Sequence, residues 1–148
     1  MEKVEEIVTT DVVTVKENHT LMEAAKIIRE RNISGAPVLN EEGDVVGVLS
    51  EADVLKVLGE LPWYSLNKIL HLQEQAQDTK HEVEKMNQIE VREVMSKHPQ
   101  TVDSDDLIND AASIMHSSGY NRLPVVDNSG KLVGIVTRAD ILASLQED

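Results

Sequence analysis

The sequence contains no cysteine and no phenylalanine, and aromatic residues make up only 2% of it. A chain without cysteine cannot form a disulfide, a thiolate zinc site, an iron–sulfur cluster or a cysteine nucleophile, and we expect an intracellular location. With one Trp and two Tyr, the core has to be built almost entirely from Val, Ile and Leu. No aromatic surface is available on which several bases of a single-stranded nucleic acid could stack.

Basic residues are also scarce, since 14 Lys and Arg face 27 Asp and Glu and give a formal net charge of −13. Such a chain lacks the basic face that nonspecific binding to nucleic acid or to an anionic membrane requires, although a small basic pocket is compatible with it. No apolar run has the length of a membrane span, and the acidic N-terminus MEKVEEIVTTDVV does not resemble a signal peptide. We therefore expect a cytoplasmic protein with neither nucleic acid nor membrane as a partner.

The chain contains a tandem duplication. Its 148 residues correspond to one ordinary domain, with 41% hydrophobic and 28% charged residues, as is typical of a globular chain. Residues 4–58 align without a gap with residues 91–145. The identical pairs include Thr14-Val15 with Thr101-Val102, Ala24-Ala25 with Ala111-Ala112, Pro37-Val38 with Pro124-Val125, Val46-Gly47 with Val133-Gly134 and Ala52-Asp53 with Ala139-Asp140.

Each copy has the pattern β-α-β-β-α, which places the chain in the α/β (α+β) class. In the first copy, a β-prone run at residues 12–15 precedes a capping box, Thr20-x-x-Glu23, and apolar residues at helical spacing. Strand-like runs at 37–39 and 45–49 flank a turn that contains Gly43, and Ser50 opens a second helix to about residue 58. The second copy repeats this order, with its turn at 127–131 and Thr137 at the start of its last helix.

Residues 59–90 match neither copy, so we predict a first repeat at 1–58, an insert at 59–90 and a second repeat at 91–148. The insert begins with enough apolar residues to pack as a helix. It continues from Gln73 to Gln88 as a polar, charged segment, for which an exposed helix and a mobile loop are both open. Trp63 and Tyr64 could anchor a partner, but we favour the alternative that they belong to a helix of the insert that covers the core.

The same motif occurs in both copies, and it spans the end of the last strand and the start of the last helix. Gly47-Val48-Leu49-Ser50-Glu51-Ala52-Asp53 and Gly134-Ile135-Val136-Thr137-Arg138-Ala139-Asp140 share a glycine, two aliphatic residues, a hydroxyl residue and, three positions later, an aspartate. Ser or Thr with an acid three residues on is typical of a helix cap, which is the interpretation that either copy alone favours. The same atoms also suit a nucleotide, because a hydroxyl and free N–H groups can hold a phosphate and a carboxylate can accept hydrogen bonds from ribose.

These features together resemble the CBS domain, named for cystathionine β-synthase. The resemblance rests on the duplication, the β-α-β-β-α order, both Gly-to-Asp motifs and the segments Ile33-Ser34-Gly35-Ala36-Pro37-Val38 and Tyr120-Asn121-Arg122-Leu123-Pro124-Val125. It implies two CBS repeats packed with pseudo-two-fold symmetry, a Bateman module, with two clefts that bind adenosine ligands such as AMP, ADP, ATP or S-adenosylmethionine. It also implies a regulatory module without a catalytic centre that pairs into a homodimer.

In this family the Asp of the motif holds the ribose and the Ser or Thr contacts a phosphate, while residues of the other repeat border the base. The resemblance therefore implies one cleft formed by Ser50, Asp53, Met95, Tyr120, Asn121 and Arg122. It implies a second cleft formed by Thr137, Arg138, Asp140, Val8, Ile33, Ser34 and Gly35.

Charge favours the Thr137 cleft for an anionic ligand. Arg138 follows Thr137, whereas Glu51 follows Ser50 in the other cleft. A phosphate prefers a cationic neighbour that can bind it through two hydrogen bonds. Arg122 is assigned to the Ser50 cleft, which therefore also stays a candidate for binding an anionic ligand. Both arginines are equally typical of a solvated surface without a ligand.

The favoured function is a sensor that binds an adenosine-containing ligand and transmits binding to a separate, unknown effector protein. The alternative is a ligand-free interaction scaffold that uses the CBS pair for dimerisation, with both motifs acting only as caps. An enzyme is not expected, because the sequence has no nucleophile next to a base and no Gly-x-x-x-x-Gly-Lys loop.

No metal site or required cofactor is expected either. The five histidines have no ligand spacing: His19, His71, His81, His98 and His116. Mg²⁺ would enter only together with a bound triphosphate.

Overall fold

The computed structural model describes residues 2–59, 84 and 86–145, and it divides into two compact units. Unit 1 consists of Met1–Val12, Glu42–Val45 and Pro99–Asp148, and unit 2 of Val13–Glu41 and Val46–His98. Each unit thus contains most of one sequence repeat together with the first residues of the other repeat. The predicted boundaries at 1–58 and 91–148 follow the sequence repeats. In the compact units, the first segment of each repeat belongs to the unit that contains most of the other repeat.

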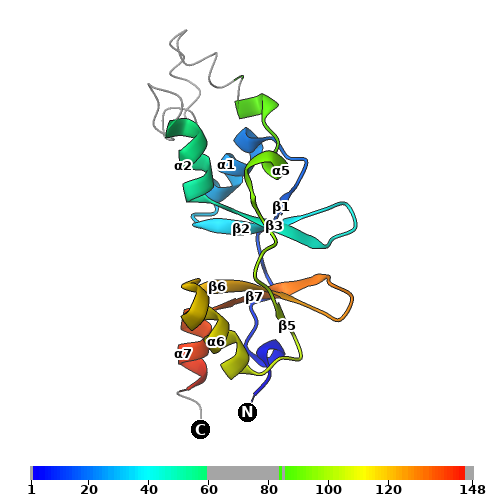
Figure 1. The fold of residues 1–148 in the computed structure, drawn as a ribbon, viewed down its shortest axis with the longest axis vertical. Coiled ribbons are helices and arrows are strands. Elements are labelled where there is room, and N and C mark those ends of the chain that lie inside the picture. Colours follow the sequence, from blue (N-terminus) through cyan, green and yellow to red (C-terminus); the bar gives the residue numbers. More distant parts are fainter. Residues whose placement is uncertain (1, 60–83, 85, 146–148) are drawn as a thin grey trace. The chain divides into compact units, whose positions relative to one another are not determined.

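Unit 2 is built around a four-stranded sheet with the order β1-β2-β3-β4. Its strands are β1 (Val15–Lys16), β2 (Gly35–Leu39), β3 (Val45–Ser50) and β4 (Ser96–Lys97). Strand β1 runs parallel to β2, and β4 runs antiparallel to β3, with Gly47 opposite Lys97. The helices α1 (Leu21–Glu30), α2 (Glu51–Gly59) and α5 (Val91–Val94) lie on one face of this sheet (Figure 1).

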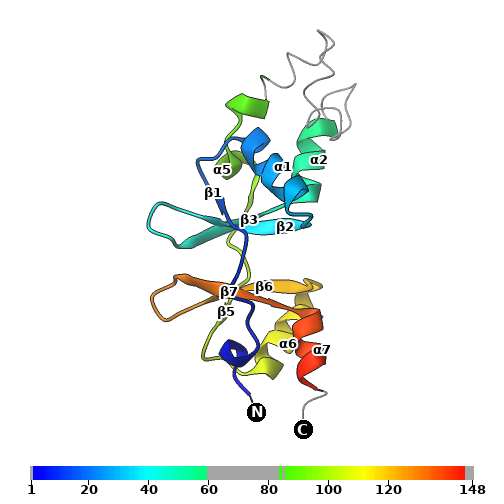
Figure 2. The ribbon, with the colours of Figure 1, turned by 180° about the vertical axis from the view of Figure 1, so that it is seen from behind.

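Unit 1 is built around a three-stranded sheet with the order β5-β6-β7. Its elements are β5 (Val102–Asp103), α6 (Ile108–Ser118), β6 (Arg122–Val126), β7 (Leu132–Thr137), α7 (Arg138–Ser144) and a 3₁₀ helix, η1 (Val4–Glu6). The N-terminal segment pairs with β7, because Thr9 and Ile135 each donate a backbone hydrogen bond to the other at 2.9 Å. Figure 2 shows this segment, in blue, against β7.

Both repeats have the element order that the sequence predicts. The first repeat runs β1-α1-β2-β3-α2 and the second runs β5-α6-β6-β7-α7. The predicted box Thr20-x-x-Glu23 caps α1, since Glu23 N donates to Thr20 Oγ1 at 3.1 Å and Thr20 N donates to Glu23 Oε1 at 2.8 Å. Gly43 and Gly130 have φ of 85° and 82° in the two hairpin turns, a conformation that glycine adopts without strain. The predicted α/β class is confirmed.

The core of each unit is aliphatic, as the composition predicts. In unit 2 it includes Leu21, Val38 and Leu49, and in unit 1 it includes Val4, Leu123 and Val136, all fully buried. Among the described residues, no polar or charged side chain is buried. The prediction of a solvent-exposed polar segment over 73–88 is wrong at Met86, which is fully buried in the core of unit 2. Residues 60–83, with Trp63 and Tyr64, lie outside the described residues.

A glycine in each sheet lets a neighbouring chain segment approach closely. A Cβ atom on Gly134 would overlap Thr9 O and lie 2.7 Å from Val8 Cγ2. A Cβ on Gly47, at the equivalent position of unit 2, would lie 2.6 Å from Met95 Sδ and 2.7 Å from Ser96 O. Both glycines are therefore needed for the first segment of one repeat to pack on the sheet of the other.

We predict that Gly134→Ala lowers the free energy of unfolding by about 1–3 kcal/mol, because the new methyl group has to displace the backbone of Thr9. Urea unfolding followed by far-UV circular dichroism measures this change. Gly59→Ala is the matched control, since no atom of the described residues lies within 4 Å of a Cβ at the end of α2 and alanine favours a helix. Equal stabilities of the two variants would contradict the role of Gly134.

Candidate functional site

The two Gly-to-Asp motifs form the same hydrogen-bonded structure at the start of α7 and of α2. In unit 1, Asp140 N donates to Thr137 Oγ1 at 3.1 Å and Thr137 N donates to Asp140 Oδ2 at 2.9 Å. In unit 2, Asp53 N donates to Ser50 Oγ at 3.2 Å and Ser50 N donates to Asp53 Oδ2 at 2.9 Å. Both motifs are therefore helix caps, as either copy alone predicts.

The caps leave part of each carboxylate available. Asp140 and Asp53 are half-buried, and each uses only Oδ2 in its cap. Neither Oδ1 atom forms a hydrogen bond with any residue that the structure describes. An ionised carboxylate has several acceptor positions, so the same side chain can cap a helix and accept a hydrogen bond from a ligand hydroxyl. Capping and ligand binding are thus compatible at both motifs.

Unit 1 brings together four of the predicted ligand residues, Thr137, Arg138, Asp140 and Val8. Val8 lies against Gly134, three residues before Thr137 on β7. Arg138 is the first residue of α7 and is exposed.

Tyr120, Asn121 and Arg122, which the family resemblance assigned to the Ser50 cleft, also belong to unit 1. Arg122 is paired with Thr137 in the β6–β7 ladder. Arg138 N donates to Asn121 O at 2.9 Å, and Tyr120 is 56% exposed. Asn121 and Arg122 therefore contact or pair with the Thr137 motif, and Tyr120 directly precedes them in the chain.

Unit 2 has the equivalent arrangement around Ser50 and Asp53. Met95 lies against Gly47, three residues before Ser50, so the predicted group of Ser50, Asp53 and Met95 is found in one unit. Ile33, Ser34 and Gly35, which were assigned to the Thr137 cleft, belong to unit 2 as well, and Glu51 N donates to Ser34 O at 2.9 Å. A contribution of these three residues to a ligand at Thr137 stays a prediction.

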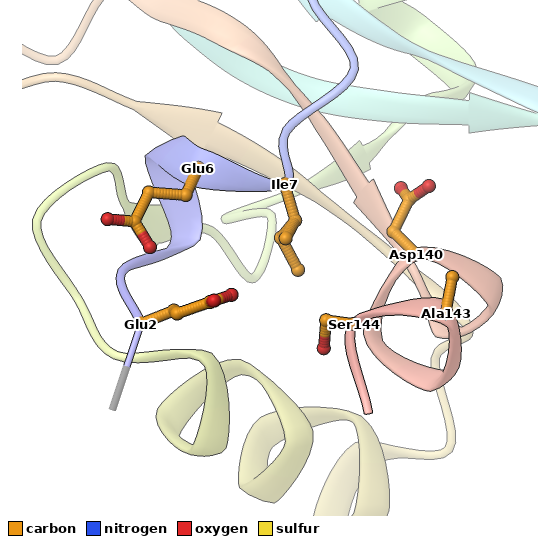
Figure 3. Close-up of a pocket in the computed structure, with 6 residues that line it drawn as sticks. All are labelled: Glu2, Glu6, Ile7, Asp140, Ala143 and Ser144. Carbon is orange, nitrogen blue, oxygen red and sulfur yellow. The ribbon is translucent and has the colours of Figure 1, made fainter. Parts of the chain in front are cut away.

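An open pocket of about 490 Å³ adjoins the Thr137 motif in unit 1. Its lining consists of Glu2, Glu6, Ile7, Asp140, Ala143 and Ser144 (Figure 3). The Glu2 side chain extends from the N-terminal segment toward Ser144 of α7, and Ile7 points into the space between them. Glu2, Glu6 and Ile7 were not predicted from the sequence. The signal that could have identified this segment is the spacing of its apolar residues Val4, Ile7 and Val8, all of which pack in or against the core of unit 1.

The described residues contain neither a candidate metal site nor a candidate membrane span. No group of three or more His, Asp or Glu side chains among them is positioned to hold a metal ion. Within residues 2–59, 84 and 86–145, no helix has the length and apolar character needed to cross a membrane. His19 instead has a local structural contact, because its Nδ1 accepts a hydrogen bond from Lys16 N at 3.0 Å.

Fold and motifs together define a tandem repeat protein with two equivalent strand-to-helix junctions. The family profile of the CBS domain matches residues 4–60 and 91–147. The chain therefore belongs to the CBS domain family and carries two CBS domains, which confirms the resemblance found in the sequence.

Known proteins and solved structures are similar over nearly the whole chain. The protein MJ1426 of Methanocaldococcus jannaschii is 36% identical, over 90% of this chain and 85% of its own. The crystal structure of CBSX2 from Arabidopsis thaliana in complex with AMP has a TM-score of 0.75 and 26% identity, covering 99% of this chain and 98% of its own. The CBS domain pair of the protein MJ0100, in complex with 5′-methylthioadenosine and S-adenosyl-L-methionine, has a TM-score of 0.71 and 26% identity, covering 99% and 97%.

We predict that Thr137→Ala lowers the free energy of unfolding by about 1 kcal/mol, because it removes the oxygen that accepts a hydrogen bond from Asp140 N. Thr137→Ser keeps this oxygen and should retain most of the stability. Thermal or urea unfolding of the two variants measures the difference. If the serine variant loses as much stability as the alanine variant, the hydroxyl does not act as a cap.

Proposed function

We propose that this protein is a regulatory module that binds adenosine-containing ligands at its two Gly-to-Asp motifs and transmits their binding to a separate effector. The observation that carries the proposal is the duplicated half-buried aspartate, which caps a helix through Oδ2 and keeps Oδ1 available. The proposal is also supported by the AMP complex of CBSX2 and the S-adenosyl-L-methionine complex of MJ0100, to both of which the chain is similar.

In this proposal each aspartate holds a ribose. Two adjacent ribose hydroxyls donate hydrogen bonds to Asp140 in one site and to Asp53 in the other, because an ionised carboxylate only accepts. The hydroxyl of Thr137 or Ser50 contacts the group at the 5′ position of the ligand, which is the first phosphate in a nucleotide. Val8 and Met95 supply apolar surface for the adenine. Further candidate contacts of the ligand are Ile33, Ser34, Gly35, Tyr120, Asn121 and Arg122. No cofactor is needed, and Mg²⁺ accompanies ATP as part of the ligand.

Signal transmission requires that the ligand bind two arrangements of the protein with different affinity. We infer a homodimer as the regulated assembly, with the effector as a further protein that reads its surface. The competing function is a scaffold in which both motifs act only as caps. The two functions differ in a single property, since only the sensor responds to a ligand.

We predict that thermal unfolding shifts upward with AMP, ADP, ATP with Mg²⁺ or S-adenosylmethionine, and not with guanosine nucleotides. A ligand at 100 times its Kd adds about 2.7 kcal/mol of stability. The shift should be reduced by Asp140→Asn and by Asp53→Asn, because an amide group replaces the ribose-binding carboxylate while its oxygen can still serve as a cap. Differential scanning fluorimetry of nucleotide-free protein measures all of these shifts.

Asp110→Asn is the matched control for this experiment. Asp110 Oδ2 accepts a hydrogen bond from Leu107 N at 3.0 Å at the start of α6, so the variant changes a cap of the same kind away from both motifs. It should retain the full ligand response. If folded, nucleotide-free protein shows no shift with any adenosine ligand, the sensor is excluded and the scaffold is favoured.

A further inference from the structure

The two motifs differ in the charge of the residues at two equivalent positions beside them. Arg122 is paired with Thr137 across the β6–β7 ladder, so both side chains lie on the same face of the sheet with Cβ atoms about 5 Å apart. Arg138 follows Thr137 directly, and its N–H donates to the carbonyl of Asn121, the residue before Arg122. The structure thus brings two guanidinium-bearing residues to one motif, whereas the family resemblance assigned them to different clefts.

The Ser50 motif has no such cations at the equivalent positions. Gly35 occupies the position of Arg122, and Glu51 occupies the position of Arg138. A Cβ atom on Gly35 would lie 2.9 Å from Leu49 O and 3.2 Å from Ser50 Cα, so close packing leaves little room for a side chain there. Close packing around Gly35 therefore disfavours a cation there, and Glu51 adds a negative charge in place of Arg138.

Both arginines are available to a ligand. Arg122 is half-buried and Arg138 is exposed. Within the described part of the chain, neither guanidinium forms an ion pair or a side-chain hydrogen bond. A guanidinium without a carboxylate partner keeps its full capacity for a bidentate contact with phosphate.

Acidic side chains adjoin the Thr137 motif at the open pocket. Glu2 and Glu6, on the N-terminal segment, line that pocket together with Asp140 of α7. Anionic groups of a ligand are repelled by Glu2 and Glu6 and attracted by Arg122 and Arg138. This charge distribution gives a ligand held by Asp140 a preferred orientation, with its phosphates toward the arginines.

We propose that the two motifs bind different classes of adenosine ligand, an inference that rests on the proposed function. The Thr137 motif binds adenosine ligands with an anionic phosphate tail. The Ser50 motif binds adenosine ligands without negative charge at the 5′ position, such as a nucleoside or thioether. Arg122 and Arg138 are the residues that set this difference.

The test uses Asp53→Asn protein, in which the Thr137 motif is intact, and isothermal titration with AMP and with adenosine. Arg122→Gln in this background should weaken AMP binding about tenfold or more and change adenosine binding less than about twofold, because one charge-assisted contact is lost. Arg31→Gln is the matched control, since it removes the same charge from an exposed position at the end of α1 in unit 2. It should leave both affinities unchanged.

A second variant tests the Ser50 motif by adding charge. In Asp140→Asn protein, adenosine should bind more tightly than AMP, and Glu51→Arg should reverse that order. If AMP and adenosine bind, but their affinity ratio is insensitive to Arg122→Gln and to Glu51→Arg, this inference is overturned while the proposed function stands. If the unmodified protein binds no adenosine ligand, both are overturned.

Discussion

The close approach of a backbone segment to a central glycine is the constraint on which the rest of this structure depends. At Gly134 the chain of Val8 and Thr9 lies where a side chain would be, and at Gly47 Met95 and Ser96 do the same. These contacts attach the first segment of each repeat to the sheet of the other. Ile7 lines a pocket together with Asp140 for that reason, and Met95 is in the same unit as Asp53. Each proposed site therefore combines residues that are distant in the sequence.

The duplicated cap explains how one short motif can serve stability and binding together. A carboxylate that accepts a backbone hydrogen bond through Oδ2 is fixed in orientation before any ligand arrives. Other helices have a carboxylate that accepts the equivalent backbone hydrogen bond without a proposed ligand, since Glu23 accepts from Thr20 N and Asp110 accepts from Leu107 N. The two Gly-to-Asp motifs differ from these caps because they follow a strand whose glycine is packed against a second chain segment.

Periodicity and capping signals predicted the elements of both repeats, because those signals are local. Local signals did not predict the exchange of first segments, since it depends on two-residue strands and single bridges such as Thr9 with Ile135. Only the family resemblance, which assigned Val8 to Thr137 and Met95 to Ser50, implied it. Arg122 was assigned to the Ser50 cleft through the family resemblance, and its pairing with Thr137 depends on strand register, which local signals do not give. Met86 was missed because a single apolar residue in a polar segment gives no periodic signal. At the sites, the motif residues were predicted and the charge of their neighbours was only partly predicted.

A crystal structure of nucleotide-free protein soaked with AMP tests the central claim most directly, because it shows which atoms hold the ligand. The account predicts electron density for AMP in which the ribose hydroxyls are within hydrogen-bond distance of Asp140 and the phosphate is beside Arg122 and Arg138. AMP bound away from both aspartates, or no bound AMP in protein soaked at millimolar concentration, would contradict the account.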